Sequence, residues 1–252
     1  MIPKTFFNKM AKDLGYTERP YVRIEELIDR VNWLLEPNIE WTRVALNFDN
    51  FQGACGTTTM DGYTVTQATT GAVSIVNGVL LIDSAGGGEG QGLNVQKTTG
   101  PYFVPAANRT IWFKCRFKVV DNANDVQLFI GLAEADTTLI TSSEMDETNS
   151  DFVGFSIEKD AAGAMKCHAC NTTDGDEDTA ATLVNDTWTE VAFRINGVTS
   201  IDFWIDGTKA TLSNITADNI PTSNLIPSFV CQADDGGTDP ILHVKYYEVM
   251  AN

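Results

Sequence analysis

Long apolar runs are missing from this sequence of 252 residues. A membrane-spanning helix needs about 20 consecutive, predominantly apolar residues, and no run approaches that length. The first residues, Met1 to Lys9, also lack the apolar stretch that a secretory signal peptide requires. We therefore expect a protein that is made in a cytoplasm and has no membrane partner.

Basic residues are scarce, with 17 Lys and Arg against 34 Asp and Glu and a formal net charge of −17. Residues 1–43 hold seven residues of each sign, so the whole excess of negative charge falls in residues 44–252. An acidic surface repels a phosphate backbone, which excludes nucleic acid as an expected partner.

Cysteine occurs five times, an odd number, and no spacing indicates a small disulfide framework. We expect five reduced thiols. The run Cys167-His168-Ala169-Cys170 has the residue types of a zinc site, but a second pair of ligands is missing and the only other histidine is His243. If the run is a strand, Cys167 and Cys170 point to opposite faces, which predicts a buried Cys167 beside an exposed or edge Cys170.

Alternating apolar residues dominate the stretch from Thr189 to Ala210. Asn196-Gly197 and Asp206-Gly207 supply turn residues between its alternating runs. Alternation with a period of two is typical of strands with one face on a core. The stretch therefore predicts a β-meander whose inward residues are Val191, Phe193, Ile195, Ile201, Phe203 and Ile205.

The same pattern recurs from Trp41 to the end of the sequence. Frequent turn residues separate the runs and helical periodicity is almost absent, which predicts a mainly β, antiparallel jelly-roll sandwich. The expected strands are 43–48, 63–67, 72–76, 78–82, 91–96, 110–120, 126–133, 152–158, 164–170, 189–195, 201–206, 208–212, 227–233 and 241–250.

Four segments carry a resemblance to a known family. From about Gly78 onward the chain resembles the concanavalin A-like (laminin G-like) jelly roll. This resemblance implies a fold that occurs in glucanases, in sugar-binding modules and in phage and viral structural proteins, so it does not fix a function. The segments are Thr187–Phe193, Ile201–Gly207, Leu225–Phe229 and Leu242–Val249.

Paired catalytic carboxylates, which glycoside hydrolysis requires, are not found. In jelly-roll glucanases they lie at alternating positions of one strand. The nearest candidate, Glu144-Met-Asp146-Glu147, lacks the third carboxylate and is surrounded by polar loop residues. We predict no catalytic residue and no enzymatic activity.

Two acidic stretches are weak calcium candidates. Asp174, Asp176 and Asp178 begin like a calcium loop, but Thr179 and Asn185 replace the glycine and glutamate of the EF-hand pattern. The alternative set is Asp234, Asp235 and Asp239, and a solvated acidic loop explains either stretch equally well. No other cofactor is expected.

Trp204 shares a predicted strand face with Asp202 and Asp206. An aromatic ring flanked by carboxylates on a sheet face is suited to contact a sugar ring. It is equally suited to pack beneath a neighbouring loop or subunit. Both interpretations remain open at this point.

Residues 1–40 differ from the rest and predict an arm that precedes a β domain at 41–252. Pro20 and Pro37 bracket a helix at about 23–35. One amphipathic helix cannot bury its apolar stripe alone, so it packs on the β domain, on a copy of itself or on another protein. The stripe, which is the predicted partner-binding surface, is Ile24, Leu27, Ile28, Val31, Leu34 and Leu35.

The arm and the acidic, Thr-, Asn- and Gly-rich body together resemble decoration or fibre-type proteins of tailed phages. This resemblance implies a non-enzymatic virion structural protein that decorates or cements a capsid, made in the host cytoplasm. It would bind the major capsid protein or another virion protein and form a homo-oligomer. The alternative is a carbohydrate-binding, lectin-like module that contacts surface glycans.

Overall fold

The computed structural model describes residues 45–49, 51, 55–68, 70–85, 88–120, 125–141, 144–172, 174–234 and 239–252. The chain divides into two units, Met1–Trp41 and Thr42–Asn252, and all described residues belong to the second. The predicted helix at 23–35 and its apolar stripe lie outside the described residues.

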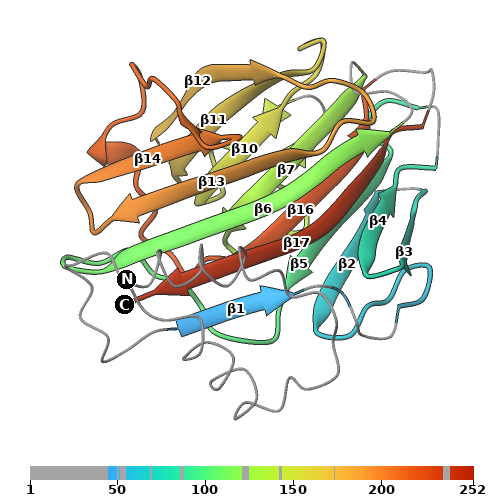
Figure 1. Ribbon diagram of the computed structural model, residues 1–252, viewed down its shortest axis with the longest axis horizontal. Helices are drawn as coiled ribbons and strands as arrows, with labels where there is room; N and C mark the ends of the chain where they lie inside the picture. The colour runs from blue at the N-terminus through green and yellow to red at the C-terminus, as the bar shows by residue number, and fades with distance from the viewer. Residues whose placement is uncertain are drawn as a thin grey trace, which may run out of the picture. The chain divides into compact units, whose positions relative to one another are not determined.

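The first sheet, here called sheet A, has eight strands. Figure 1 shows β13, β6 and β17 as its long central strands. β17 pairs with β6 along one edge, and with β4 and then β1 along the other. The order is β15 (Thr208–Lys209), β14 (Ser200–Ile205), β13 (Thr189–Asn196), β6 (Thr110–Val120), β17 (Ile241–Ala251), β4 (Val79–Asp83) and β3 (Ala72–Val76), with β1 (Ala45–Asp49) beside β17.

The second sheet, sheet B, has seven strands and is also antiparallel. A small hairpin, β8 (Ile140–Thr141) and β9 (Glu144–Met145), and a 3-10 helix, η1 (Ala217–Asn219), lie outside the two sheets. The order in sheet B is β12 (Asp174–Thr182), β11 (Ala164–Asn171), β10 (Phe152–Ile157), β7 (Val126–Ala133), β16 (Ile226–Ala233), β5 (Gly92–Lys97) and β2 (Tyr63–Ala68).

Alternation along each strand produces the core between the sheets. β6 alternates half-buried and buried residues over its whole length, as a strand with one face on a core must. Phe113 stacks on Phe193 of β13, with ring centroids 4.9 Å apart. Phe155 of sheet B meets Phe203 of sheet A edge to face at 5.4 Å, and all four rings are fully buried. Aromatic packing thus joins the two sheets.

The prediction of a mainly β protein with antiparallel sheets is confirmed, and the architecture is consistent with a jelly-roll sandwich. Three strands of the described residues were missed, the two-residue strands β8 and β9 and the long strand β12. Asp174–Thr182 was interpreted as an acidic loop but forms β12, which pairs with β11 from Ala164 to Asn171. Its acidic composition hid it, because an edge strand with few apolar residues shows no hydrophobic alternation.

Candidate functional site

The outer face of sheet B, which is the face turned away from the core, is covered over its central strands. All residues of β7, β10 and β16 are buried on both faces. A second hydrophobic cluster forms there between outward residues of the sheet and the segment 134–151, which we call the covering segment. It contains Phe129, Phe152, Val230, Ala133 and Cys170 from the sheet and Leu139, Ile140 and Met145 from the covering segment.

Amide side chains of β5 attach one end of the covering segment. Gln96 Nε2 donates to the carbonyl of Glu134 at 2.9 Å, and its Oε1 accepts from the backbone N–H of Asp136 at 3.0 Å. Asn94 Nδ2 donates to the carbonyl of Asp136 at 2.7 Å. These contacts give hydrogen-bond partners to three backbone groups of the covering segment.

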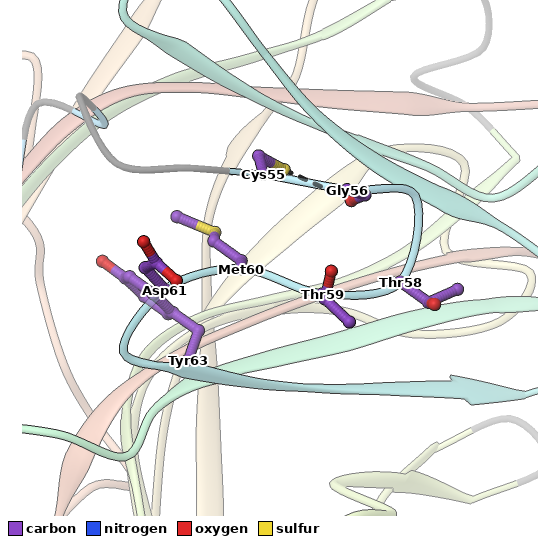
Figure 2. Close-up of a pocket in the computed structure, with 7 residues that line it drawn as sticks. All are labelled: Cys55, Gly56, Thr58, Thr59, Met60, Asp61 and Tyr63. Carbon is purple, nitrogen blue, oxygen red and sulfur yellow. Dashed lines mark hydrogen bonds between the residues drawn. The ribbon is translucent and has the colours of Figure 1, made fainter.

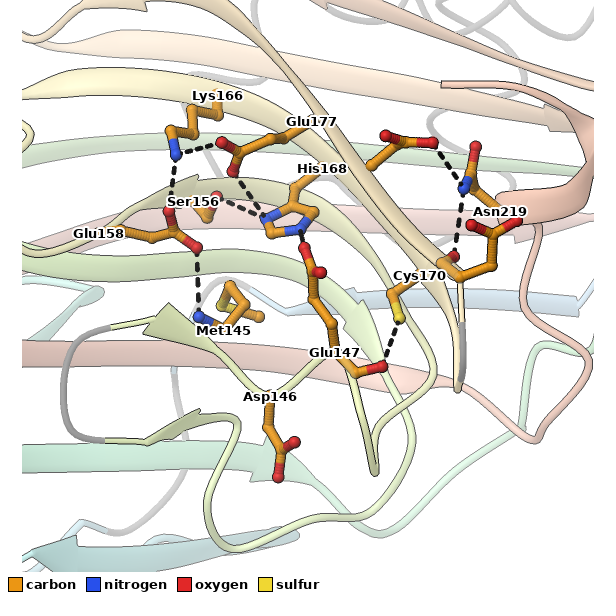
Figure 3. Close-up of polar contacts among 12 residues, drawn as sticks. Met145, Asp146, Glu147, Ser156, Glu158, Lys166, His168, Cys170, Glu177 and Asn219 are labelled. Carbon is orange, nitrogen blue, oxygen red and sulfur yellow. Dashed lines mark hydrogen bonds and ion pairs between the residues drawn. The ribbon is translucent and has the colours of Figure 1, made fainter. Parts of the chain in front are cut away.

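His168 of β11 attaches the other end. Its ring is fully buried, and Figure 3 shows it between Ser156, Glu177 and Glu147. Nδ1 lies 3.0 Å from Ser156 Oγ, and Nε2 lies 2.6 Å from Glu147 Oε1. The hydrogen bond from His168 is the largest influence on Glu147 and lowers the pKa of that carboxyl. Glu147 therefore holds the covering segment to the sheet as a carboxylate.

Three hydrogen-bonded side chains, the Ser156 hydroxyl, the His168 imidazole and the Glu147 carboxylate, have the composition of a hydrolase triad. Its geometry does not support that chemistry. Ser156 and His168 are both fully buried, whereas a nucleophile has to reach a substrate. Opening the covering segment would carry Glu147 away and dismantle the chain of hydrogen bonds.

Glu158, His168 and Glu177 could offer one metal-ligating atom each, all within 4.8 Å of one another. Lys166 already supplies positive charge there, since its Nζ bonds Glu158 Oε2 at 2.6 Å and also bonds Glu177. Burial lowers the pKa of Lys166, but the bonds to the two carboxylates outweigh it and the net shift is upward. An ammonium group fixed between the carboxylates stands where a metal ion would have to bind.

The carboxylates considered for hydrolysis belong to the covering segment. Glu144 is exposed. Asp146 closes a turn by accepting from the Thr148 hydroxyl at 2.9 Å and from Asn149 Nδ2 at 3.0 Å. Figure 3 shows Asp146 pointing away from His168, while Glu147 points towards it. They form no pair along one strand, in agreement with the absence of the glucanase pattern.

All five cysteines are free thiols, as predicted. Cys167 lies in the core between the sheets and Cys170 in the second cluster, so they do point to opposite faces. The expectation of an exposed or edge Cys170 was wrong, because the covering segment buries it and accepts its thiol proton at the carbonyl of Glu147, 3.3 Å away. Burial raises the pKa of Cys170 to about 12, which makes it a poor nucleophile.

Asp174, Asp176 and Asp178 occupy alternate positions of β12. Asp176 and Asp178 accept hydrogen bonds from the segment that contains η1. Asp178 accepts from the Ser213 hydroxyl at 2.6 Å and from the Ser213 N–H at 2.9 Å, and Asp176 accepts from Asn219 at 3.3 Å. The expectation of a loop was wrong here, and calcium binding by this set stays a prediction. In the alternative set, Asp235 lies outside the described residues.

The outer face of sheet A is open in comparison and carries the predicted glycan contacts. Trp204 of β14 is half-buried and stacks on Trp112 of β6, with ring centroids 5.6 Å apart and an interplanar angle of 27°. The guanidinium of Arg194 lies 4.9 Å from the centroid of Trp112 and 5.7 Å from that of Trp204. We call Trp112, Trp204 and Arg194 the tryptophan platform.

Asp202 lies beside the tryptophan platform and Asp206 in the following turn. The Asp202 carboxylate accepts from Arg194 Nη2 at 2.7 Å, from Lys209 Nζ at 2.7 Å and from Asn196 Nδ2 at 3.1 Å. Burial raises the pKa of Asp202, but these donors outweigh it and the net shift is downward. Asp206 is exposed and accepts from the Glu190 N–H at 2.8 Å.

Sequence reasoning placed Trp204 and Asp202 together but missed Trp112, Arg194 and Lys209. Trp112 falls on the outward positions of the alternating run at 110–120, which was a usable signal. The pairing of β6 with β13 and of β13 with β14 brings these residues into one patch. The predicted meander included the second pairing, but the sequence alone does not specify the first.

A shallow pocket of about 380 Å³ lies in the loop from Cys55 to Tyr63. Figure 2 shows Asp61 and Tyr63 on one side and Cys55 on the other. The Cys55 thiol donates to the carbonyl of Gly56 at 3.4 Å, and burial raises the pKa of that thiol. Among the described lining residues the only ionisable side chains besides the thiol are Asp61 and Tyr63, and no histidine or cation lies there to favour the thiolate.

Among the described residues, no helix is long and apolar enough to cross a membrane. No protein-family model matches the chain, and the search of curated proteins found no match.

The fold is similar to those of solved lectins and of a glycoside hydrolase. Peanut lectin matches with a TM-score of 0.57 and 10% identity, over 83% of this chain and 98% of that chain. Lectin I of Ulex europaeus, solved with the methyl glycoside of α-L-fucose, matches with a TM-score of 0.56 and 9% identity, over 83% and 98%. A GH16 protein of Bacteroides ovatus, solved with a product, matches with a TM-score of 0.53 and 9% identity, over 81% and 99%. At these identities the likeness concerns the fold alone.

Proposed function

We propose that this chain is a non-catalytic, lectin-like module that binds carbohydrate on the outer face of sheet A. The tryptophan platform is the observation that carries the proposal, since it presents two partly exposed indole rings on one face. Apolar faces of sugar rings pack on aromatic rings, and hydroxyl groups take hydrogen bonds from nearby amide and charged groups. Asn196, Lys209 and Asp202 offer such groups beside the indoles.

The other faces support this choice by elimination. The covering segment packs on the central strands of sheet B, so a glycan reaches the outer face of those strands only if that segment opens. The carboxylates of the covering segment are engaged in a turn and with His168. The alternation of half-buried and buried residues on β6 and β13 leaves the outer face of sheet A accessible.

The similarity to lectin-like solved structures favours a carbohydrate as the ligand. Among carbohydrates, a polysaccharide of a cell surface or cell wall suits an open platform. A flat, open face contacts a few sugar units of a longer chain, whereas a small ligand is usually held in a concave pocket. We therefore expect millimolar to micromolar affinity for an oligosaccharide.

A glycan array followed by calorimetric titration of the best ligand tests the proposal. We expect Trp204→Ala and Trp112→Ala each to weaken binding by at least about 10-fold, because each removes one stacking surface. Trp188→Ala is the matched control. Trp188 also lies near lysine side chains, Lys118 and Lys245, but it is not part of the platform. No binding to any glycan, or equal losses in all three variants, would contradict the proposal.

A second candidate is a virion role, in which the chain decorates or cements a tailed-phage capsid through its arm and assembles as a homo-oligomer. The distribution of charge along the sequence favours the virion role, because residues 1–43 have no net charge whereas residues 44–252 carry the whole net charge of −17. A neutral arm can approach an acidic assembly that repels the body. The two roles are compatible, since a decorating protein can present a glycan-binding face.

The virion role is tested by mass analysis of purified particles and by the double variant Leu27→Asp with Val31→Asp. We expect this variant to lose attachment or self-assembly while the melting temperature stays within about 4 °C. Unchanged attachment, or a collapsed melt, would contradict the role assigned to the arm.

A further inference from the structure

Cations concentrate on the outer face of sheet A. Apart from the seven basic and seven acidic residues in 1–43, the chain holds ten Lys and Arg and 27 Asp and Glu. The exposed and half-buried positions of β6, β13, β14, β15 and β17 nevertheless carry six cations and three carboxylates. The cations are Lys114, Arg116, Lys118, Arg194, Lys209 and Lys245, and the carboxylates are Glu190, Asp202 and Glu248. This face therefore attracts an acidic polymer that the excess of carboxylates elsewhere in residues 44–252 repels.

Five of the six cations are engaged with described residues. Lys245 Nζ lies 5.9 Å from the centroid of the Trp188 ring, and four others pair with carboxylates. Arg116, which is half-buried, forms no hydrogen bond and no ion pair with any described residue. The pairs are Lys114 with Glu190, Lys118 with Asp186, and both Arg194 and Lys209 with Asp202.

The cross-strand neighbours of Arg116 are bonded to each other. Glu190 lies opposite Arg116 on β13, and Tyr246 lies opposite it on β17. The Tyr246 hydroxyl donates to Glu190 Oε2 at 2.7 Å, and Glu190 Oε1 pairs with Lys114 at 2.9 Å. Burial and the bond to Glu190 raise the pKa of Tyr246, and the nearby charge of Arg116 opposes that rise. Arg116 thus lies beside a neutral hydroxyl and a carboxylate whose two oxygens are engaged, so its planar fork of N–H donors is available to an incoming anion.

Arg116 and the tryptophan platform share one strand. Trp112 and Arg116 both occupy outward positions of β6. They are four residues apart, which separates their Cα atoms by roughly 13 Å. A glycan of several units that stacks on the platform can extend along β6 and reach the guanidinium of Arg116.

We propose that the ligand of this face is an acidic polysaccharide and that Arg116 binds its anionic groups. The inference rests on the proposed function, because it names the class of glycan that the tryptophan platform binds. The two oxygens of a uronic-acid carboxylate match the N–H donors of a guanidinium in a bidentate arrangement. A sulfate ester offers the same charge and similar acceptor oxygens, so the experiment includes both groups.

A glycan array that carries each uronate-bearing glycan beside its methyl ester, together with sulfated and neutral glycans, tests the proposal with the full chain. The ester keeps the sugar rings and removes the charge. Calorimetric titration of the best pair should show that the acid binds about 3- to 10-fold more tightly than its ester, because the ester loses a charge-assisted hydrogen bond. This preference should shrink when the salt concentration is raised from about 0.05 M to about 0.5 M, since salt screens the attraction.

Variants assign the preference to one residue. Arg116→Gln should lower the affinity for the acid to that for the ester and leave the affinity for the ester unchanged. Trp204→Ala should weaken the binding of both ligands, because both stack on the platform. Lys159→Ala is the matched control and should change neither affinity, since it removes a positive charge from the turn after β10 of sheet B.

The outcomes separate this inference from the proposed function. Equal affinity for the acid and its ester, or a preference for the acid that persists in Arg116→Gln, would overturn the inference. The proposed function would stand in either case if Trp204→Ala still weakened binding. A preference for sulfated glycans that Arg116→Gln abolishes would support the inference and identify the anion as a sulfate ester. Binding of no glycan would overturn both.

Discussion

The outer faces of the two sheets differ in how far their outward side chains are buried. On sheet A, β6 alternates buried and half-buried residues, and its outward positions carry Trp112 and three cations, Lys114, Arg116 and Lys118. On sheet B, β7 and β10 are buried at every position, because the covering segment packs on outward Phe129 and Phe152. The burial pattern of a strand therefore reports what covers each of its faces, and only an uncovered face can contact a partner.

The largest expected effect concerns the covered face. Phe152→Ala should lower the free energy of unfolding by about 3–5 kcal/mol, because Phe152 packs edge to face on both Phe129 and His168 beneath the covering segment. Trp204→Ala on the open face should cost less than half as much, since its indole is only half-buried. Denaturant unfolding of both variants checks this. Equal losses would mean that the two faces are equally packed.

A smaller effect is expected from the contact between Glu147 and His168. Glu147→Gln should lower the free energy of unfolding by about 1–2 kcal/mol at neutral pH, since it removes a charge-assisted hydrogen bond at a partly exposed carboxylate. The contact lowers the pKa of Glu147 in the folded protein. Its stabilisation is therefore fully present above the unfolded pKa of about 4.3 and is lost as the pH falls through the lower, folded value.

Unfolding curves measured from pH 7 to pH 3 isolate this contribution. The wild-type protein and Glu147→Gln should converge in stability as the pH falls below about 4.3. A constant difference between Glu147→Gln and the wild-type protein over that range would contradict the role of Glu147 in holding the covering segment.

The smallest effect is a difference in thiol reactivity. Denatured protein should titrate as five free thiols, whereas only the half-exposed Cys55 should react rapidly in the folded state. Cys170 beneath the covering segment and Cys167 in the core should both react slowly, and Cys170 should react first if the covering segment opens before the sandwich unfolds. Mass spectrometry after timed alkylation measures the order. Rapid labelling of Cys170 would show that the outer face of sheet B is open in solution.

The sequence alone predicted the strands that have one buried face and one partly exposed face. Phe193 and Phe203 were placed on the core by alternation alone, and both are fully buried. The acidic strand β12 and the covering segment were not predictable. Local alternation is weak in an edge strand, and Leu139, Ile140 and Met145 show no period that indicates which face they cover.

For the candidate site, the sequence placed Trp204 beside Asp202 but did not indicate what shares the patch. Trp112 reaches Trp204 across β13, where small Ala192 pairs with Lys114 on one side and Trp204 on the other. That arrangement depends on the pairing of β13 with β6, which lies far earlier in the sequence than the consecutive strands β13 and β14. Strand order is a long-range property, and local pattern does not encode it.

Hydrogen exchange with and without the best array ligand tests the central claim, that recognition occurs on the open face, most directly. We expect slower exchange of backbone amides in β14 and β15 and at the start of β6, around Trp204 and Trp112, and unchanged exchange in the covering segment. Slower exchange confined to residues 134–151, with none around Trp204, would contradict it and place the ligand on the outer face of sheet B.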